Sequence, residues 1–476
     1  MNLMTNKSLA APTATAFPVA RAAAATVASR ELTASLSPRG FAIGLYLEHL
    51  EEASFLYDQR CALLDDPEVR WIDLADFEKR LEAHVDALVL GSDLALGLCR
   101  QHAAFGDTGQ YHAAISVICR QRRLDLLGAA LAPLDPADDE RIRTAGDALA
   151  RELPREWDEV VSSMVTARHA GLRRIAAHVI GFRRLGDVAR LDATVRAGGS
   201  YALPELIWAL GRLRAGANAT LAGILEGEPN EAIQWAATIA LLRGGDRRPV
   251  VHGLRQAHRF PSLLLAVGLA GGRTDLRSLL KIHAQGVAET HCLLAMGFLG
   301  DVSAVEPLLA ALQNDTTAEA ATTALHLITG GDCYERAVIP ETLQDDELFE
   351  GEKAGAPAES TPSCHTVTRL SRDPATWRTW WRENESRFQQ FVRYREGRPY
   401  SPATVLRTLT GERNERRIRE LAYDELVIRY GADVPFETDM LVVEQEQALA
   451  KLEQWVMSAE PLYRPGDWYF AERLLE

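Results

Sequence analysis

Apolar residues in the middle of the chain recur at helical spacing, and each helical run ends in a small turn that contains glycine. In one clear unit, Ala288 to Asp315, a first run is formed by Leu293, Leu294, Met296 and Leu299. The turn Gly300-Asp301 follows, and then a second run with Val305, Leu308, Leu309 and Leu312. Spacings of three and four residues are those of an amphipathic helix. The pattern predicts two helices joined by a turn, which is a helical hairpin.

The same kind of turn recurs six times between residues 155 and 332. The last glycines of these turns are residues 186, 216, 245, 272, 300 and 331, so they lie 30, 29, 27, 28 and 31 residues apart. Glycine ends a helix because it adopts the left-handed conformation without penalty, and a following Asp can cap the next helix. A fixed period of this length is typical of stacked repeats, whose hairpins cover one another's apolar faces. The alternative is a non-repetitive helical bundle with coincidental turns.

The repeated unit resembles a known class of repeat. Its period is shorter than that of ordinary HEAT units and is similar to that of the compact HEAT-like repeats in phycobilin-lyase-type proteins. The resemblance implies an all-α fold, a HEAT-like α-solenoid of about six helical hairpins of 27–31 residues over residues 151–334. Such a resemblance implies a fold and no particular chemistry.

A helical module is expected before the array, over residues 41–150. Two runs, Phe41 to Leu64 and Asp73 to Leu90, predict an antiparallel helix pair, because Asp65-Asp66-Pro67 interrupts the chain between them. A third run, Leu94 to Phe105, leaves open that the array begins there. The alanine-rich residues 1–40 are predicted to be a disordered tail.

An acidic linker and a second helical module are expected after the array. Residues 335–370 are predicted to be a solvated linker because residues 335–360 hold eight acids against two cations. Asp373-Pro374 is a favourable N-cap and first-turn pair. Helical runs follow at Ser401 to Leu409, Arg416 to Tyr430 and Met440 to Val456. Residues 371–476 are therefore predicted to form a separate helical domain.

Composition narrows the classes of function. The chain has 476 residues, of which 47% are hydrophobic and 25% charged, which is the balance of a globular protein. Its net charge of -14 repels phosphate groups, so nucleic acid is not the expected partner. The six cysteines form no CxxC pair, which favours reduced thiols. The longest apolar stretch, Phe260 to Gly272, is shorter than the ~20 residues that span a bilayer. A cytoplasmic protein without a membrane partner is expected.

Motifs that carry catalytic chemistry are missing from the sequence. No His is followed by Glu, and neither ExxH nor HExxH occurs, so the helical di-iron and zinc-protease patterns are absent. The phosphate-binding glycine loops and the GxSxG turn are absent as well. Cys333 and Cys364-His365 are too few for a zinc site. His49 and His84 are expected to face each other across a helix pair as a hydrogen bond or a solvated face. No enzyme, cofactor or metal site is expected.

Two groups of residues are candidates for binding a partner. Arg173, Arg174, Arg183 and Arg184 make the first repeats locally basic. In an acidic chain such a cluster more often pairs with acids or meets an acidic partner than binds nucleic acid. Trp377 and Trp381 are either core residues or aromatic anchors for a partner protein.

Two segments resemble an uncharacterised proteobacterial family of HEAT-repeat proteins. The first contains Glu51-Glu52-Ala53-Ser54-Phe55-Leu56-Tyr57 and the run from Arg80 to Leu88; the second contains Arg393-Tyr394-Arg395, Gly397-Arg398-Pro399 and the run from Glu425 to Arg429. Members are often found near type VI secretion genes. The resemblance implies a non-enzymatic adaptor or accessory chaperone whose protein partner is a secreted effector or spike-tip protein. The alternative is an enzyme or nucleic-acid-binding protein with an unrecognised site.

Overall fold

The computed structural model describes residues 37–197, 203–214, 219–287, 289–340 and 364–475. Helices make up most of these residues, and the strands among them form only two-stranded ribbons. The predicted all-α class is therefore confirmed. None of the described helices is both long and apolar enough to cross a membrane. The tail predicted over residues 1–40 lies outside the described residues as far as residue 36, and Ser37 caps α2 (Pro38–Leu64).

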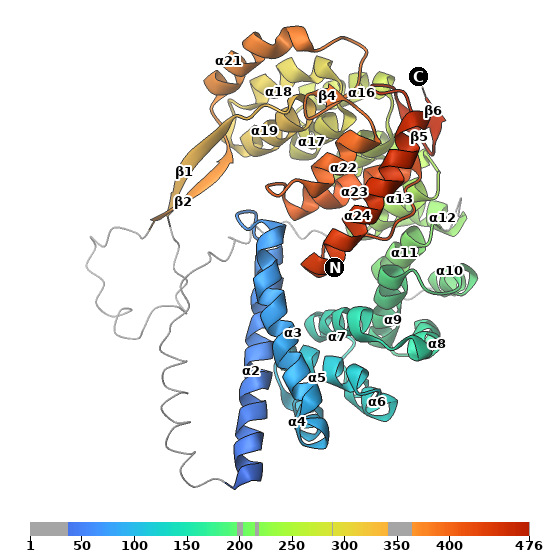
Figure 1. Ribbon diagram of the computed structural model, residues 1–476. Coiled ribbons are helices and arrows are strands. Elements are labelled where there is room, and N and C mark those ends of the chain that lie inside the picture. Colours follow the sequence, from blue (N-terminus) through green and yellow to red (C-terminus); the bar gives the residue numbers. More distant parts are fainter. Residues whose placement is uncertain (1–36, 198–202, 215–218, 288, 341–363, 476) are drawn as a thin grey trace, which may run out of the picture.

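A curved row of stacked helices forms the body of the molecule (Figure 1). The first helix of each hairpin packs against the first helix of the next. These helices are α9 (Ala170–Arg183), α11 (Leu203–Arg212), α13 (Glu231–Arg243), α15 (Leu265–Ala270), α17 (Glu289–Leu299) and α19 (Asp315–Thr329). The second helices are α10 (Val188–Ala197), α12 (Ala219–Gly227), α14 (Arg248–Gln256), α16 (Leu276–Ala284) and α18 (Val305–Ala311). This arrangement confirms the predicted α-solenoid.

Small residues let consecutive first helices approach closely. A Cβ atom added to Gly181 would lie 2.1 Å from the ring of Trp208 on the next helix. One added to Gly211 would meet the backbone of Ala240 at 2.9 Å, and one added to Gly297 would meet Ala324 at 2.6 Å. Gly211 follows Gly181 by one repeat and Gly297 follows Gly211 by about three, so the close approach is set by the same position in different repeats.

Glycines in the left-handed conformation lie in several of the turns after the first helices, as the repeat pattern predicts, whereas Gly272, with φ −106°, does not adopt it. Gly186, Gly245 and Gly300 have φ values of 102°, 82° and 77°, and each leads into a second helix. The sixth turn is different: Gly330, with φ 63°, leads into a strand, so α19 has no second helix. The last predicted hairpin is therefore only its first half.

The row of first helices extends to the N-terminal side of residue 151. The helices α5 (Thr108–Arg120) and α7 (Asp139–Glu152) pack against each other, and α7 packs against α9. Between α5 and α6 (Leu124–Leu131), Arg122 takes the left-handed conformation with φ 56°. A glycine-based period does not detect this turn, and for that reason the boundary predicted at 151 falls inside a continuous array.

Two paired strands occupy the ends of the segment predicted to be a linker. Strands β1 (Tyr334–Pro340) and β2 (Cys364–Leu370) are antiparallel, with Arg336 opposite Thr368 and Val338 opposite Thr366. Backbone pairing orders these residues despite their polar composition, which corrects the linker prediction for 335–340 and 364–370. The acidic residues 341–363 lie outside the described residues.

Residues 371–475, the C-terminal segment, contain four longer helices. They are α21 (Pro374–Asn384), α22 (Pro402–Thr410), α23 (Arg416–Tyr430) and α24 (Val442–Ala459), together with the short ribbons β3–β4 (Tyr394–Arg395, Arg398–Pro399) and β5–β6 (Tyr469–Phe470, Arg473–Leu474). Part of this segment has a core of its own around Tyr400 and Phe436. Another part, which includes Trp377, Ile428 and Trp468, belongs to the same buried cluster as α15, α17 and α19. The shared core corrects the prediction of a separate domain.

Candidate functional site

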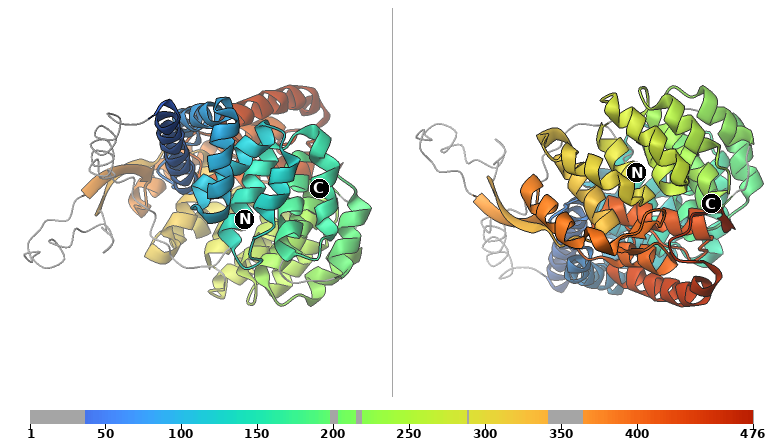
Figure 2. Two further views of the ribbon diagram at one scale, coloured as in Figure 1. Left: turned by 90° about the horizontal axis from the view of Figure 1, so that it is seen from below. Right: turned by 90° about the horizontal axis from the view of Figure 1, so that it is seen from above.

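The C-terminal segment fills the inside of the curve that the solenoid makes. The helices α22, α23 and α24 lie within the arc formed by the repeats (Figures 1 and 2). The helix α23 contacts α13 and α15, and α24 contacts α3 (Ala75–Leu90) in the N-terminal module. The concave face, where solenoids usually bind their ligands, is thus occupied by the protein's own chain.

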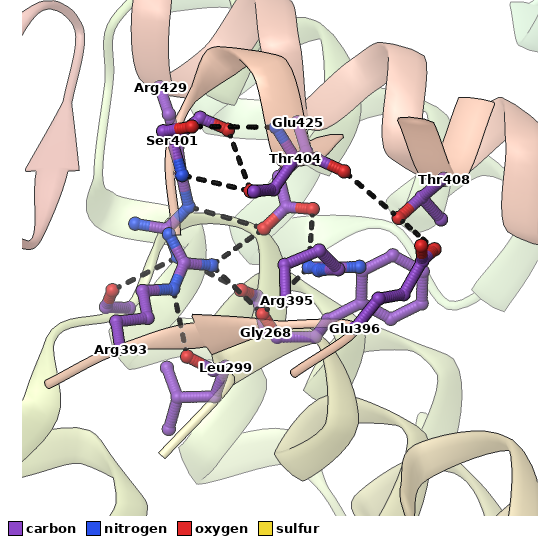
Figure 3. Close-up of polar contacts among 12 residues, drawn as sticks. Gly268, Leu299, Arg393, Arg395, Glu396, Ser401, Thr404, Thr408, Glu425 and Arg429 are labelled. Atoms are coloured by element: carbon purple, nitrogen blue, oxygen red, sulfur yellow. Dashed lines mark hydrogen bonds and ion pairs between the residues drawn. The ribbon is translucent and has the colours of Figure 1, made fainter. Parts of the chain in front are cut away.

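Three buried arginines and one glutamate join this segment to the repeats (Figure 3). Glu425 accepts hydrogen bonds from Arg393 at 2.6 Å and Arg395 at 2.7 Å, and Arg429 lies 3.5 Å from the same carboxylate. All four side chains have no exposed surface. Burial, followed by the charge of Arg393, lowers the pKa of Arg429 to about 10. The group remains ionised at neutral pH.

The same arginines cap the carboxyl ends of the repeat helices. Arg393 donates to the carbonyls of Phe298 and Leu299 at 2.8 and 2.9 Å, at the end of α17. Arg429 donates to the carbonyls of Gly268 and Gly271 at 2.9 and 3.2 Å, at the end of α15. The last carbonyls of a helix have no partner inside it and carry partial negative charge, so a cation there is favourable. The runs that contain Arg393 and Arg395 and that contain Glu425 and Arg429 thus meet in one structural contact.

A second set of ion pairs lies next to this one. Arg212 of α11 donates to Asp424 and to Glu437, both at 2.9 Å, and Arg243 of α13 donates to Asp424 at 2.5 Å. Arg184 also pairs with Glu437, at 2.8 Å. These arginines lie at the carboxyl ends of three successive first helices, and both acids come from the C-terminal segment. The concave face therefore holds the C-terminal segment through two acidic side chains of that segment.

The N-terminal module completes the enclosure. Arg60 of α2 pairs with Glu78 of α3 at 2.7 Å and donates to the carbonyl of Asp439 at 2.8 Å. Glu78 in turn accepts from the backbone N–H of Val442 at 2.6 Å. Because these charged groups are buried and mutually paired, the loop that carries Asp439 is held against the N-terminal module.

A polar cavity of about 520 Å³ remains between the N-terminal module, the repeats and the C-terminal segment. Its walls contain Trp208 and Trp235 and a mixture of acids and arginines. The acids are Asp65, Asp66, Asp147, Glu319, Glu415, Glu420, Asp424, Glu437 and Asp439, and the arginines are Arg60, Arg143, Arg151, Arg212, Arg416 and Arg417. Acids outnumber arginines, so the cavity favours cationic groups.

Three side chains in this cavity lie close enough to share one ion. Single ligand atoms of Asp147, His178 and Asp439 all lie within 4.8 Å of one another. Burial alone would raise the pKa of Asp147, but the hydrogen bond and charge of His178, followed by the charge of Arg151, hold this pKa well below its usual range. Asp147 is therefore a carboxylate at neutral pH. Within the part of the chain that the structure describes, this is the group of acids and histidines with metal-binding geometry.

The four predicted arginines do not form one binding surface. Arg173 donates to the carbonyls of Ala167 and Arg168, and Arg174 pairs with Asp139 at 2.5 Å and with Glu205 at 2.7 Å. Arg183 pairs with Asp158 at 3.1 Å, and Arg184 turns toward the C-terminal segment. Each guanidinium is bonded inside the molecule, and three of the four, those of Arg174, Arg183 and Arg184, pair with acids.

The two predicted tryptophans are packed against the protein's own chain. Trp377 is buried and donates its indole N–H to the carbonyl of Ser371 at 2.7 Å. Trp381 is half-buried, and its ring centroid lies 5.2 Å from that of Phe388. The buried ring of Trp377 is not accessible to a partner in this structure, which corrects its assignment as an anchor. Of the other candidates, His49 and His84 do face each other, with their Nδ1 atoms 3.0 Å apart.

Short motifs cannot reveal the cavity residues, because His178 follows Asp147 by 31 residues and Asp439 comes from the C-terminal segment. One signal was available. A separation of 31 residues is one repeat period, so Asp147 and His178 occupy equivalent positions on neighbouring first helices. Comparison with known proteins adds no family: neither a scan against protein-family models nor a search of curated proteins finds a match.

Proposed function

We propose that the protein is a non-enzymatic, protein-binding scaffold. The observation that carries the proposal is the projecting ribbon β1–β2, which extends away from the body of the solenoid (Figures 1 and 2). Because the C-terminal segment fills the concave face, a partner needs another surface. A projecting ribbon offers both a face and an unpaired edge to another protein.

One face of the ribbon is suited to contact with a partner. Tyr334, Arg336 and Val338 of β1 and Thr366 and Thr368 of β2 share this face and are exposed, and Val338 is 66% exposed. The opposite face carries the ion pair between Glu335 and Arg369, at 3.0 Å. Aromatic and arginine side chains are enriched where proteins bind one another.

The more specific form of the proposal rests on the family resemblance. The scaffold is then a cytoplasmic adaptor or accessory chaperone of a type VI secretion system, and its partner is a secreted effector or a spike-tip protein. The bonding of Arg173, Arg174 and Arg183 within the chain supports a protein partner over nucleic acid.

Affinity capture tests the proposal. The tagged full chain is expressed with its genomic neighbours, and captured proteins are identified and quantified by mass spectrometry. We expect one secretion-related protein in stoichiometric amount, and we expect Val338→Lys to reduce its recovery at least about tenfold, as loss of a central contact does. Val251→Lys is the matched control, because Val251 is also exposed, at 50%, but lies on the outer helix α14. Absence of a stoichiometric partner contradicts the scaffold, and equal recovery with both variants contradicts the ribbon.

A further inference from the structure

The three cavity side chains have the spacing of a metal site. Asp147 Oδ1 lies 3.3 Å from His178 Nε2. Two ligands of a tetrahedral ion with bonds of about 2.0–2.1 Å are separated by about 3.3–3.4 Å. The ligand atom of Asp439 lies within 4.8 Å of both. A small movement of the Asp439 side chain would bring all three atoms to bonding distance of one ion.

The first two side chains are held in place by their surroundings. The ring of His178 stacks on Trp208, with centroids 5.7 Å apart and planes 10° apart. Gly181 makes room for Trp208, and Gly146 packs so closely that a Cβ atom there would lie 3.1 Å from the His178 ring. Tyr57 donates to Oδ2 of Asp147 at 3.1 Å, which leaves Oδ1 directed toward His178. Metal ligands are commonly oriented by such outer contacts.

The polar atoms of this group are poorly satisfied by the protein alone. The buried His178 Nε2 has one long contact, 3.3 Å to Asp147 Oδ1, and makes no shorter hydrogen bond to the residues that the structure describes. The Asp439 carboxylate makes no hydrogen bond or ion pair to any residue that the structure describes, although the backbone carbonyl of Asp439 accepts from Arg60 and Arg151. The loop is therefore fixed while its carboxylate remains available. Buried polar atoms normally have close partners, so an imidazole nitrogen held by one long contact beside two carboxylates is compatible with a bound cation.

The charge balance of the cavity is compatible with a divalent ion. Nine acids and six arginines line it, and two of the acids belong to the proposed site. Arg151 donates to the Asp439 carbonyl at 3.0 Å. Two carboxylates and one imidazole suit zinc or manganese better than magnesium or calcium, which prefer oxygen ligands alone.

We propose that Asp147, His178 and Asp439 bind one divalent transition-metal ion, with Zn²⁺ as the best-fitting ion. Three protein ligands leave a fourth position for water, open to the cavity. The ion joins α7, α9 and the loop before α24, so it fastens the C-terminal segment to the concave face. This inference is independent of the partner-binding proposal.

Calorimetric titration of Zn²⁺ into the chelator-treated full chain tests the proposal. We expect one equivalent of Zn²⁺ to bind and to raise the melting temperature, because a ligand of the native state stabilises it. Asp439→Asn is the most informative variant. The Asp439 carboxylate makes no hydrogen bond or ion pair to the described residues, so the fold should persist. We expect it to weaken binding at least about tenfold, and His178→Gln to do the same.

The control distinguishes the proposed site from the histidine pair His49–His84 elsewhere in the molecule. His49→Gln removes one member of the pair His49–His84 and should leave the affinity unchanged. Substitution with Co²⁺ should give an absorption spectrum without a thiolate charge-transfer band, because Cys61, although it lines the cavity, is not a proposed ligand. Failure to bind one equivalent, equal affinity in Asp439→Asn, or loss of binding only in His49→Gln would each overturn the proposal.

Discussion

Arginine is the residue that holds this molecule together, because one guanidinium can satisfy acceptors of different kinds at once. Arg393 donates to a carboxylate and to two helix-end carbonyls, and Arg212 bridges two acids. A planar group with five donors can do this, whereas the compact ammonium of lysine cannot reproduce the geometry. The chain's strong preference for arginine over lysine therefore has structural consequences at these positions.

Replacement of Glu425 by glutamine tests the buried ion network. Three guanidinium groups share this one carboxylate in a region without solvent exposure. Removing one member of a buried ion pair leaves charge uncompensated and costs about 3–5 kcal/mol. We expect Glu425→Gln to lower the free energy of unfolding in urea by that amount. Glu412→Gln, which breaks the exposed pair with Arg70, should change it by less than about 1 kcal/mol. Equal losses would contradict the special role of Glu425.

Helix packing in the N-terminal module depends on a neutral histidine. His112 of α5 stacks on Tyr57 of α2, with ring centroids 4.0 Å apart, and is 5% exposed. Both ring nitrogens are buried without hydrogen-bond partners. Burial, followed by the charge of Arg151, lowers the pKa of His112 to about 3. The contact between α2 and α5 therefore requires the uncharged imidazole.

This depressed pKa makes stability depend on pH in a known direction. In the unfolded chain, histidine has a pKa of about 6.5 and binds a proton below that pH, while folded His112 does not. The contribution of neutral His112 to the free energy of unfolding is present above pH 6.5. It is lost as the pH falls toward 3, at about 1.4 kcal/mol per pH unit. Between pH 7 and pH 5 we expect His112→Phe to lose about 2 kcal/mol less stability than the wild type. The exposed control His258→Gln should behave as the wild type, and an unchanged slope in His112→Phe would contradict the interpretation.

The residues that end each helix determine which elements can be predicted from the sequence. Repeats that end in a left-handed glycine, such as Gly245 and Gly300, could be predicted from their period. The hairpin of α5 and α6 could not be predicted in this way, because the left-handed residue in its turn is Arg122 and not a glycine. At the start of the predicted linker, Arg336 and Val338 alternate with Glu335 and Ala337 in the pattern of a strand, but the acidic composition favoured a solvated segment. The cavity residues come from three distant stretches, so only the tertiary structure brings them together.

At the scale of the whole molecule, the solenoid is closed by its own C-terminal segment. An open array of repeats has contacts only between neighbours, so its parts can unfold separately. Here α23 reaches α13 and α15, while α24 reaches the N-terminal module. Contacts between distant parts of the chain couple repeats that would otherwise be independent. The molecule should therefore unfold more cooperatively than its repeats alone would.

Native-state hydrogen exchange measures this coupling. Because α15, α17 and α23 share one buried cluster and its capping arginines, we expect their most protected amides to open with the same free energy in increasing denaturant. In the ribbon β1–β2 each strand pairs only with the other, and the ribbon projects from the body. Its amides should therefore open at lower free energy. A separate C-terminal domain would behave differently: α23 would exchange through its own opening, before α15 and α17. The same measurement with one equivalent of Zn²⁺ shows which helices the ion stabilises. Zn²⁺ bound at Asp439 should slow the opening of α24 together with α7 and α9.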